Sequence, residues 1–74
     1  MELLDRITIE PEKCGGKPCI RGMRIRVVDV LELLADGLTA DEVVHQLPDL
    51  EPEDVKASLL FAARQANRPE RGHG

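Results

Sequence analysis

Residues 14–26, CGGKPCIRGMRIR, decide how the N-terminal part of this 74-residue chain folds. The stretch holds three of the six glycines and no acidic residue. A two-residue turn at Gly22-Met23 suits a type II′ hairpin, because that turn takes Gly at its first central position. The sequence therefore predicts a β-hairpin over residues 19–26.

This turn also determines which side chains of the hairpin face each other. Side chains directly opposite share one face of the ribbon, so Ile20 and Ile25 form an apolar face. The other predicted pairs bring three guanidinium groups together on the opposite face: Arg21 with Arg24, and Cys19 with Arg26. Like charges directly opposite destabilise a hairpin, so this arginine face (Arg21, Arg24 and Arg26) needs a counter-charge from outside it.

Two interpretations of the arginine face stay open. Carboxylates of the following segment, Asp29, Glu32 or Asp36, neutralise it within the chain, or it binds an anionic partner. A two-stranded ribbon fits the DNA major groove, and Arg suits bidentate contact with guanine or phosphate. Because opposed like charges are poorly arranged for self-neutralisation, we expect Arg24 and Arg26 to face a partner. The candidate residues for binding DNA or a partner are Lys17, Arg21, Arg24 and Arg26.

Apolar spacing predicts one more strand and three helices. Ile7-Thr8-Ile9 alternates, and Pro11 ends the strand, which must pair with the hairpin of its own chain or of a partner. The first helix is expected from Val27 and is ended by Gly37 at its C′ position, and the second covers residues 39–47, with Thr39 as N-cap, and stops before Pro48. The third is expected from Pro52 to about Asn67. On the last helix the predicted apolar stripe is Val55, Leu59, Ala62, Ala63 and Ala66, widened by Leu60 and Phe61.

The expected fold class is α+β. A short N-terminal strand and β-hairpin precede a three-helix, helix-turn-helix-like (homeodomain-like) bundle. Residues 1–67 form a single domain, and residues 68–74 are expected to be a disordered tail. So short a chain buries a modest fraction of its surface, so we expect a homodimer, for which exchange of the N-terminal strand is one route.

Charge is segregated along the chain. The net charge is −4, but residues 13–26 carry five positive charges, and residues 27–55 carry nine negative charges and no Lys or Arg. Net charge argues against a non-specific polyanion binder, whereas local sign decides what each surface binds. Phe61 is the single aromatic residue, which disfavours single-stranded nucleic acid as a ligand. No apolar run approaches a membrane span and no secretory signal is recognisable, so a cytoplasmic protein without membrane contact is expected.

Metal, cofactor and catalytic sites are not expected. Cys14 and Cys19 lack a second pair or a nearby His to complete a zinc site, and we expect a buried Cys19 and a loop Cys14. Gly15-Gly16-Lys17 lacks the spacing of a phosphate loop, and its glycines are expected to serve a turn with positive φ. No nucleophile with a base, and no cofactor fingerprint, indicates an enzyme.

The second and third predicted helices have the spacing of a DNA-binding helix-turn-helix. The first turn of the third helix, residues 51–54, is acidic, however, and would repel phosphate. The arginine face is therefore the better candidate for operator binding.

The motif formed by Gly16-Lys17-Pro18, Ile20-Arg21-Gly22 and Arg24-Ile25 resembles the GKP-x-IRG-x-RI signature of a family of small bacterial domains. The resemblance runs from about Ile7 to about Ala66 and includes PDL-x-x-x-DV-x-x-x-L-x-x-A from Pro48 onward. The family usually has Thr where this chain has Met23, and often a non-basic residue in place of Arg26. Genes of the family often neighbour a PIN-like ribonuclease toxin.

This resemblance implies an antitoxin of a type II toxin–antitoxin pair. Such a protein neutralises a PIN-like ribonuclease by direct binding, and it binds operator DNA as a dimer. One hypothesis is that basic residues at the C-terminal end reach into an acidic active site of the toxin: Arg64, Arg68 and Arg71. The alternatives are a plain DNA-binding transcriptional regulator and a protein-binding adaptor that does not bind DNA.

Overall fold

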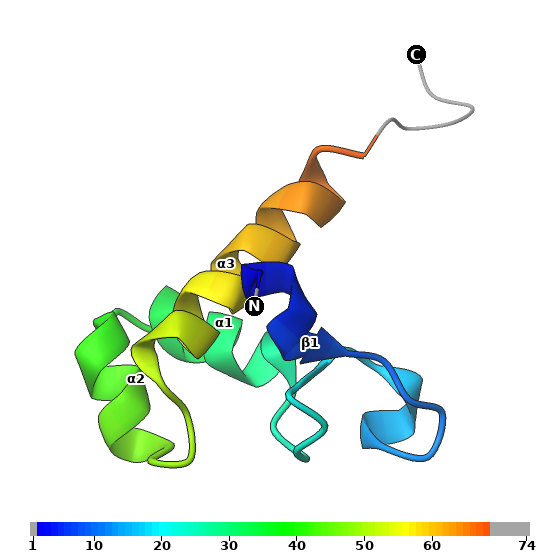
Figure 1. Cartoon of the computed structure of the whole chain (residues 1–74). Coiled ribbons are helices and arrows are strands. Elements are labelled where there is room, and N and C mark those ends of the chain that lie inside the picture. Colours follow the sequence, from blue (N-terminus) through cyan, green and yellow to red (C-terminus); the bar gives the residue numbers. More distant parts are fainter. Residues whose placement is uncertain (1, 69–74) are drawn as a thin grey trace.

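The structure is a computed structural model that describes residues 2–68 (Figure 1). Its elements are η1 (Leu3–Arg6), β1 (Ile7–Thr8), η2 (Cys14–Gly16), β2 (Cys19–Ile20), α1 (Val27–Ala35), α2 (Ala40–Gln46) and α3 (Pro52–Ala66). The fold is therefore α+β, with a small antiparallel sheet followed by three helices, as the sequence predicts. Of the predicted tail, residues 69–74 lie outside the described residues.

The N-terminal strand pairs within its own chain. β1 runs antiparallel to β2, with Ile7 opposite Ile20 and Thr8 opposite Cys19. Of the two pairings that the sequence left open, the structure has the intramolecular one. The sheet lies beside η1, and η1 packs against α3 (Figure 1).

The hairpin register is confirmed, but the turn that closes it is not the predicted one. Cys19 opposes Arg26, and the Ile20 amide donates to the Ile25 carbonyl at 2.9 Å. The chain turns one residue early: φ is +47° at Arg21 and +70° at Gly22, and the Met23 amide donates to the Ile20 carbonyl. Positive φ at both central residues is typical of a type I′ turn, not II′. Arg21 therefore belongs to the turn and does not pair with Arg24.

The helix boundaries follow the local sequence signals. Gly37, with φ of +103°, follows the last turn of α1, and Pro52 opens α3. At the start of α2, the Glu42 amide donates to Thr39 Oγ1 at 3.1 Å, and the Thr39 amide donates to Glu42 Oε1 at 2.7 Å. This reciprocal pair is the predicted capping box.

The buried face of α3 differs from the predicted apolar stripe. Val55 is buried, but Leu59 is 49% exposed. The buried residues of this helix are Asp54, Val55, Ala57 and Ser58, of which Asp54 and Ser58 are polar. Ser58 Oγ donates to the Asp54 carbonyl at 3.0 Å, so its hydroxyl is satisfied inside the core. A stripe drawn through the apolar residues alone lies on a different side of the helix from the buried face. It treats Asp54 and Ser58 as surface residues, although both are buried with their hydrogen bonds satisfied.

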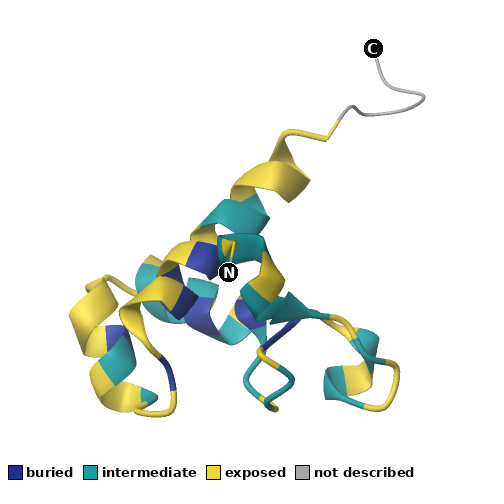
Figure 2. Ribbon diagram, viewed as in Figure 1, coloured by how far each residue is buried: buried dark blue, intermediate teal, exposed yellow. Residues whose placement is uncertain are grey.

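The core lies where α1, α2, the start of α3 and the hairpin meet, and Figure 2 shows how small it is. Its fully buried apolar cluster consists of Ile20, Val27, Val30, Val43, Leu50 and Val55. The C-terminal half of α3 extends beyond the other elements and is half-buried or exposed (Figures 1 and 2).

Cys14 and Cys19 are joined in a disulfide, which the sequence analysis did not expect. Cys19 is 1% exposed, as predicted, but Cys14 is its partner and not a separate loop thiol. Between them Gly15 and Gly16 have φ of +63° and +80°, the conformation expected of these glycines. A single pair of cysteines gives no sequence signal of pairing, because pairing depends on the path of the intervening loop.

Within residues 2–68, no helix combines the length and the apolar composition that crossing a membrane requires.

Candidate functional site

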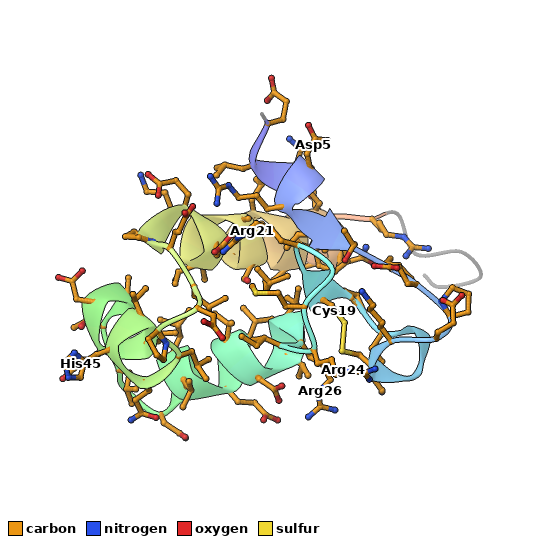
Figure 3. The ribbon with its side chains drawn as sticks, turned by 60° about the horizontal axis from the view of Figure 1, so that its bottom comes forward. Asp5, Cys19, Arg21, Arg24, Arg26 and His45 are labelled. Atoms are coloured by element: carbon orange, nitrogen blue, oxygen red, sulfur yellow. A yellow bond between two sulfur atoms is a disulfide. The ribbon has the colours of Figure 1, made fainter. Side chains whose placement is uncertain are left out.

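The arginine face does not form. Figure 3 shows Arg21 over the start of α3, well apart from Arg24 and Arg26. The guanidinium of Arg21 binds Asp54, and that of Arg26 binds Asp29. The predicted gathering of three guanidinium groups on one side is therefore wrong, because the early turn redirects Arg21 toward α3.

Asp54 is the centre of the most elaborate polar cluster in the described chain. Its side chain is fully buried. It accepts hydrogen bonds from Arg21 Nη2 at 2.8 Å, from Arg21 Nε at 3.1 Å and from Arg6 Nη1 at 3.0 Å. The Glu51 amide donates to it at 2.8 Å, so the same carboxylate also caps α3. One side chain thus connects η1, the hairpin turn and the third helix.

Arg21 reaches this position at a conformational cost. A non-glycine residue with positive φ is strained by about 1 kcal/mol or more. Such strain persists only where surrounding contacts compensate it. Here the compensation is the bidentate contact with Asp54, together with a third hydrogen bond from Arg21 Nη2 to the Asp49 carbonyl at 3.0 Å.

The ionised form of Asp54 is favoured despite its burial. Burial raises the pKa of this carboxyl, but hydrogen bonds from Arg21, from the Glu51 amide and from Arg6 outweigh burial and hold the pKa below its ordinary value. Conversely, the hydrogen bond to Asp54 raises the pKa of Arg21. The cluster is therefore an ion network at neutral pH.

Arg26 forms a weaker, more exposed pair. Arg26 Nη2 and Nε donate to the Asp29 carboxylate at 2.8 Å and 3.1 Å, with 42% and 36% of the two side chains exposed. The hydrogen bond from Arg26 lowers the pKa of Asp29. Arg21 and Arg26 thus both pair with carboxylates of their own chain, and binding of a partner by either residue stays a prediction. Asp29 was among the acids named from the sequence, and Asp54 was not.

Lys17 and Arg24 remain as exposed cations. Neither side chain forms an ion pair with a carboxylate of residues 2–68. Lys17 borders a groove between α1 and α3, and Arg24 borders a hollow between the hairpin, α1 and α2. The structure therefore does not bring the candidate residues together, and a contact of Lys17 or Arg24 with a partner stays a prediction.

The two surface depressions differ in chemistry. The groove has a volume of about 390 Å³ and is lined by Lys17, Pro18, Val27, Val28, Leu31, Phe61, Ala62 and Gln65. The hollow has a volume of about 490 Å³, and its lining includes Arg24 and three carboxylates: Asp29, Glu32 and Asp36. The first depression is apolar and the second is acidic. Within residues 2–68 no group of three His, Cys, Asp or Glu side chains is arranged to hold a metal ion.

Sequence reasoning missed the Asp54 cluster. Both Arg21 and Asp54 occur in the quoted motifs, IRG and PDL-x-x-x-DV, so the resemblance contained the signal without revealing that the two residues touch. Arg6 precedes the resembling segment, and nothing in its sequence context marked it. From the sequence, Asp54 counted only as one of the acids of residues 51–54 that would repel phosphate.

Comparison with known proteins places this geometry in a family. A family model described as "Protein of unknown function (DUF433)" matches residues 7–62, which is most of the chain. The chain belongs to the DUF433 family. The match confirms the predicted membership in a family of small domains.

Two relatives support the assignment of the DUF433 domain. The uncharacterized protein y4eO of Sinorhizobium fredii is 33% identical over 66 residues, which cover 89% of this chain and 28% of y4eO. The crystal structure of a DUF433 member from Anabaena variabilis has a TM-score of 0.77 and 30% identity, covering 82% of this chain and 60% of that one. This chain thus spans less than a third of y4eO and about three fifths of the crystallised member.

Removing the carboxylate of the cluster should destabilise the DUF433 domain. Asp54→Asn leaves two arginines facing a neutral amide, and we expect the free energy of unfolding to fall by about 3 kcal/mol, as for other broken buried ion pairs. The control is Glu53→Gln, which removes an exposed charge from the same helix turn and should change stability by less than about 1 kcal/mol. Urea unfolding measures both, and equal losses in the two variants would contradict a structural role for Asp54.

The lowered pKa of Asp54 also predicts how stability depends on pH. A carboxyl with a depressed folded-state pKa stabilises the fold above its unfolded pKa of about 3.9, and this contribution is lost as pH falls through the folded pKa. The stability difference between the parent and Asp54→Asn should therefore be largest near neutral pH and shrink below about pH 4. A difference that is constant from pH 7 to pH 3, measured by urea unfolding, would show that Asp54 is not the titrating group.

Proposed function

We propose that this DUF433 domain is the antitoxin of a type II toxin–antitoxin pair. It acts by binding and not by catalysis, and it neutralises a PIN-like ribonuclease by direct contact. The GKP-x-IRG-x-RI resemblance motivates the proposal. The observation that carries it is the acidic hollow beside α1, where Glu32 and Asp36 form no ion pair within residues 2–68, while Asp29 is paired with Arg26.

An acidic surface suits a ribonuclease as partner. An enzyme that binds RNA must attract a polyanion, so its RNA-binding surface carries positive charge. Further exposed carboxylates extend the acidity of the hollow over α2 and the start of α3: Asp41, Glu42, Asp49 and Glu53. A surface of this kind occupies the place of RNA, and electrostatic attraction speeds the encounter. This explanation replaces the tail hypothesis as the main means of blocking, since Arg64 and Arg68 would repel a basic surface.

The proposal is tested by co-expression with the adjacent gene product, affinity purification and a ribonuclease assay. Glu32→Lys reverses one charge in the hollow and should weaken the complex at least about tenfold, with matching recovery of ribonuclease activity. The matched control is Glu12→Lys, which makes the same change at an exposed acid in the loop between β1 and η2, outside the hollow and outside the acidic surface of α2 and α3. Added salt should also weaken the complex.

Failure to co-purify with the ribonuclease would remove the antitoxin function. Equal weakening by both variants would leave binding but refute the hollow as its location. Circular dichroism of each variant controls for loss of fold.

A second candidate function is operator binding by a dimer, which would also suit a plain transcriptional regulator. It is favoured by Arg24, an exposed cation that has no carboxylate partner within residues 2–68. It is opposed by the three carboxylates that share the hollow with Arg24, because they repel phosphate. The structure thus favours protein binding over DNA binding as the main role.

Arg24→Gln separates these functions. Because Arg24 is exposed, its loss should leave thermal stability nearly unchanged. If the dimer binds its operator through this residue, the slope of log affinity against log salt should fall by about 0.9 for each phosphate that the variant no longer neutralises. The measurement is operator affinity at two salt concentrations. Arg21→Gln is the comparison variant, which is expected to lose stability instead. An unchanged slope for Arg24→Gln would exclude Arg24 from DNA binding.

A further inference from the structure

We propose that the apolar groove between α1 and the C-terminal half of α3 is the surface at which a second copy of this chain binds. The inference rests on the proposed function, which includes a dimer, and it assigns the surface through which that dimer forms. The groove runs over Val27 and Val28 at the start of α1, and over Phe61 and Ala62 on α3.

The groove continues the hydrophobic core outward. Val27 is 2% exposed and belongs to the core cluster, while Leu31 and Phe61 are partly buried and pack against it. Val28 is 40% exposed. Because α3 extends past the other elements in Figure 1, the face that is buried near its start is uncovered near its end. A second copy would complete the burial of this face, and so small a core gains stability from the added area.

Charge explains why the occupant is another copy. The chain has a net charge of −4, so two copies repel each other wherever carboxylates meet. Three other hollows on the described surface each carry two or three carboxylates: Asp41 and Glu42 in one, Asp29, Glu32 and Asp36 in another, and Glu2 and Asp5 in the third. The groove lining contains one cation, Lys17, and no acid. It is therefore a surface through which an acidic chain can approach itself without carboxylate repulsion.

The two-fold geometry of such a dimer leaves the acidic hollow accessible. In an isologous dimer both copies use the same patch, so each groove faces the other. With about 3.6 residues per helical turn, Val28 and Leu31 lie on a different face of α1 from Asp29 and Asp36, whereas Glu32, four residues after Val28, lies between them. The dimer contact and the acidic hollow thus occupy adjacent faces of one helix that meet at Val28 and Glu32, and each dimer presents two hollows.

The test introduces a carboxylate into the groove. Val28→Glu places an acid in the first turn of α1, where the helix dipole favours it, so the fold should persist. Leu59→Glu is the matched control, because Leu59 is similarly exposed on α3 but does not line the groove. Gln65→Glu is a second groove variant at an exposed position, which decides the matter if Val28→Glu fails to fold.

Sedimentation equilibrium of the full chain is the measurement. The parent and Leu59→Glu should have twice the chain mass, and the groove variants should dissociate with a constant raised at least about tenfold. A monomeric parent, or groove variants as dimeric as the parent, would overturn the inference.

Binding of the PIN-like ribonuclease is measured on the same proteins. Groove variants that stay dimeric but lose the ribonuclease would show that the toxin occupies the groove, which overturns this inference and leaves the antitoxin function intact. A parent that dimerises through the groove without binding the ribonuclease would support the inference and refute the proposed function.

Discussion

The contact between Asp54 and its arginines is the interaction on which the arrangement of this domain depends. A buried carboxylate costs several kcal/mol in lost hydration, and only well-directed partners compensate it. Here Arg6, Arg21 and the amide of Glu51 supply them, from η1, the hairpin turn and the start of α3. The fold thus joins three distant parts of the chain at one charged point, where a purely apolar core would have left their mutual orientation less constrained.

The same contact determines what the hairpin can do. The guanidinium of Arg21 is occupied by Asp54, and that of Arg26 by Asp29. Of the five positive charges of residues 13–26, those of Arg21 and Arg26 are therefore neutralised by acids that follow in the sequence, while Lys17 and Arg24 stay exposed. Exposed carboxylates remain on α1, on α2 and in the first turn of α3. The folded domain is therefore acidic, which is the opposite of the charge that its hairpin suggests.

Local signals in the sequence predicted the elements well, and contacts between distant residues account for what was missed. The capping box of Thr39, the positive φ of Gly37 and Pro52 at the start of α3 act within a few residues, so the helix boundaries could be predicted. Arg21, in the turn, is bound by Asp54, some thirty positions along the chain, and Asp54 is itself one of the buried residues of α3. No periodicity reveals a pair at that separation. The disulfide was missed because only the folded loop brings Cys14 to Cys19.

The first helix contributes residues to both surfaces on which the proposed function depends. Its apolar residues contribute both to the core and to the groove, while Asp29, Glu32 and Asp36 line the hollow on another face. An ordinary surface helix needs only one apolar stripe. On α1 the stripe is wide enough to continue past the core to the exposed Val28, and the acids keep to the remaining face. These faces adjoin at Val28 and Glu32, which are four residues apart and therefore neighbours on the helix surface. The proposed association of two copies and the proposed capture of a basic protein thus involve neighbouring surfaces of one helix.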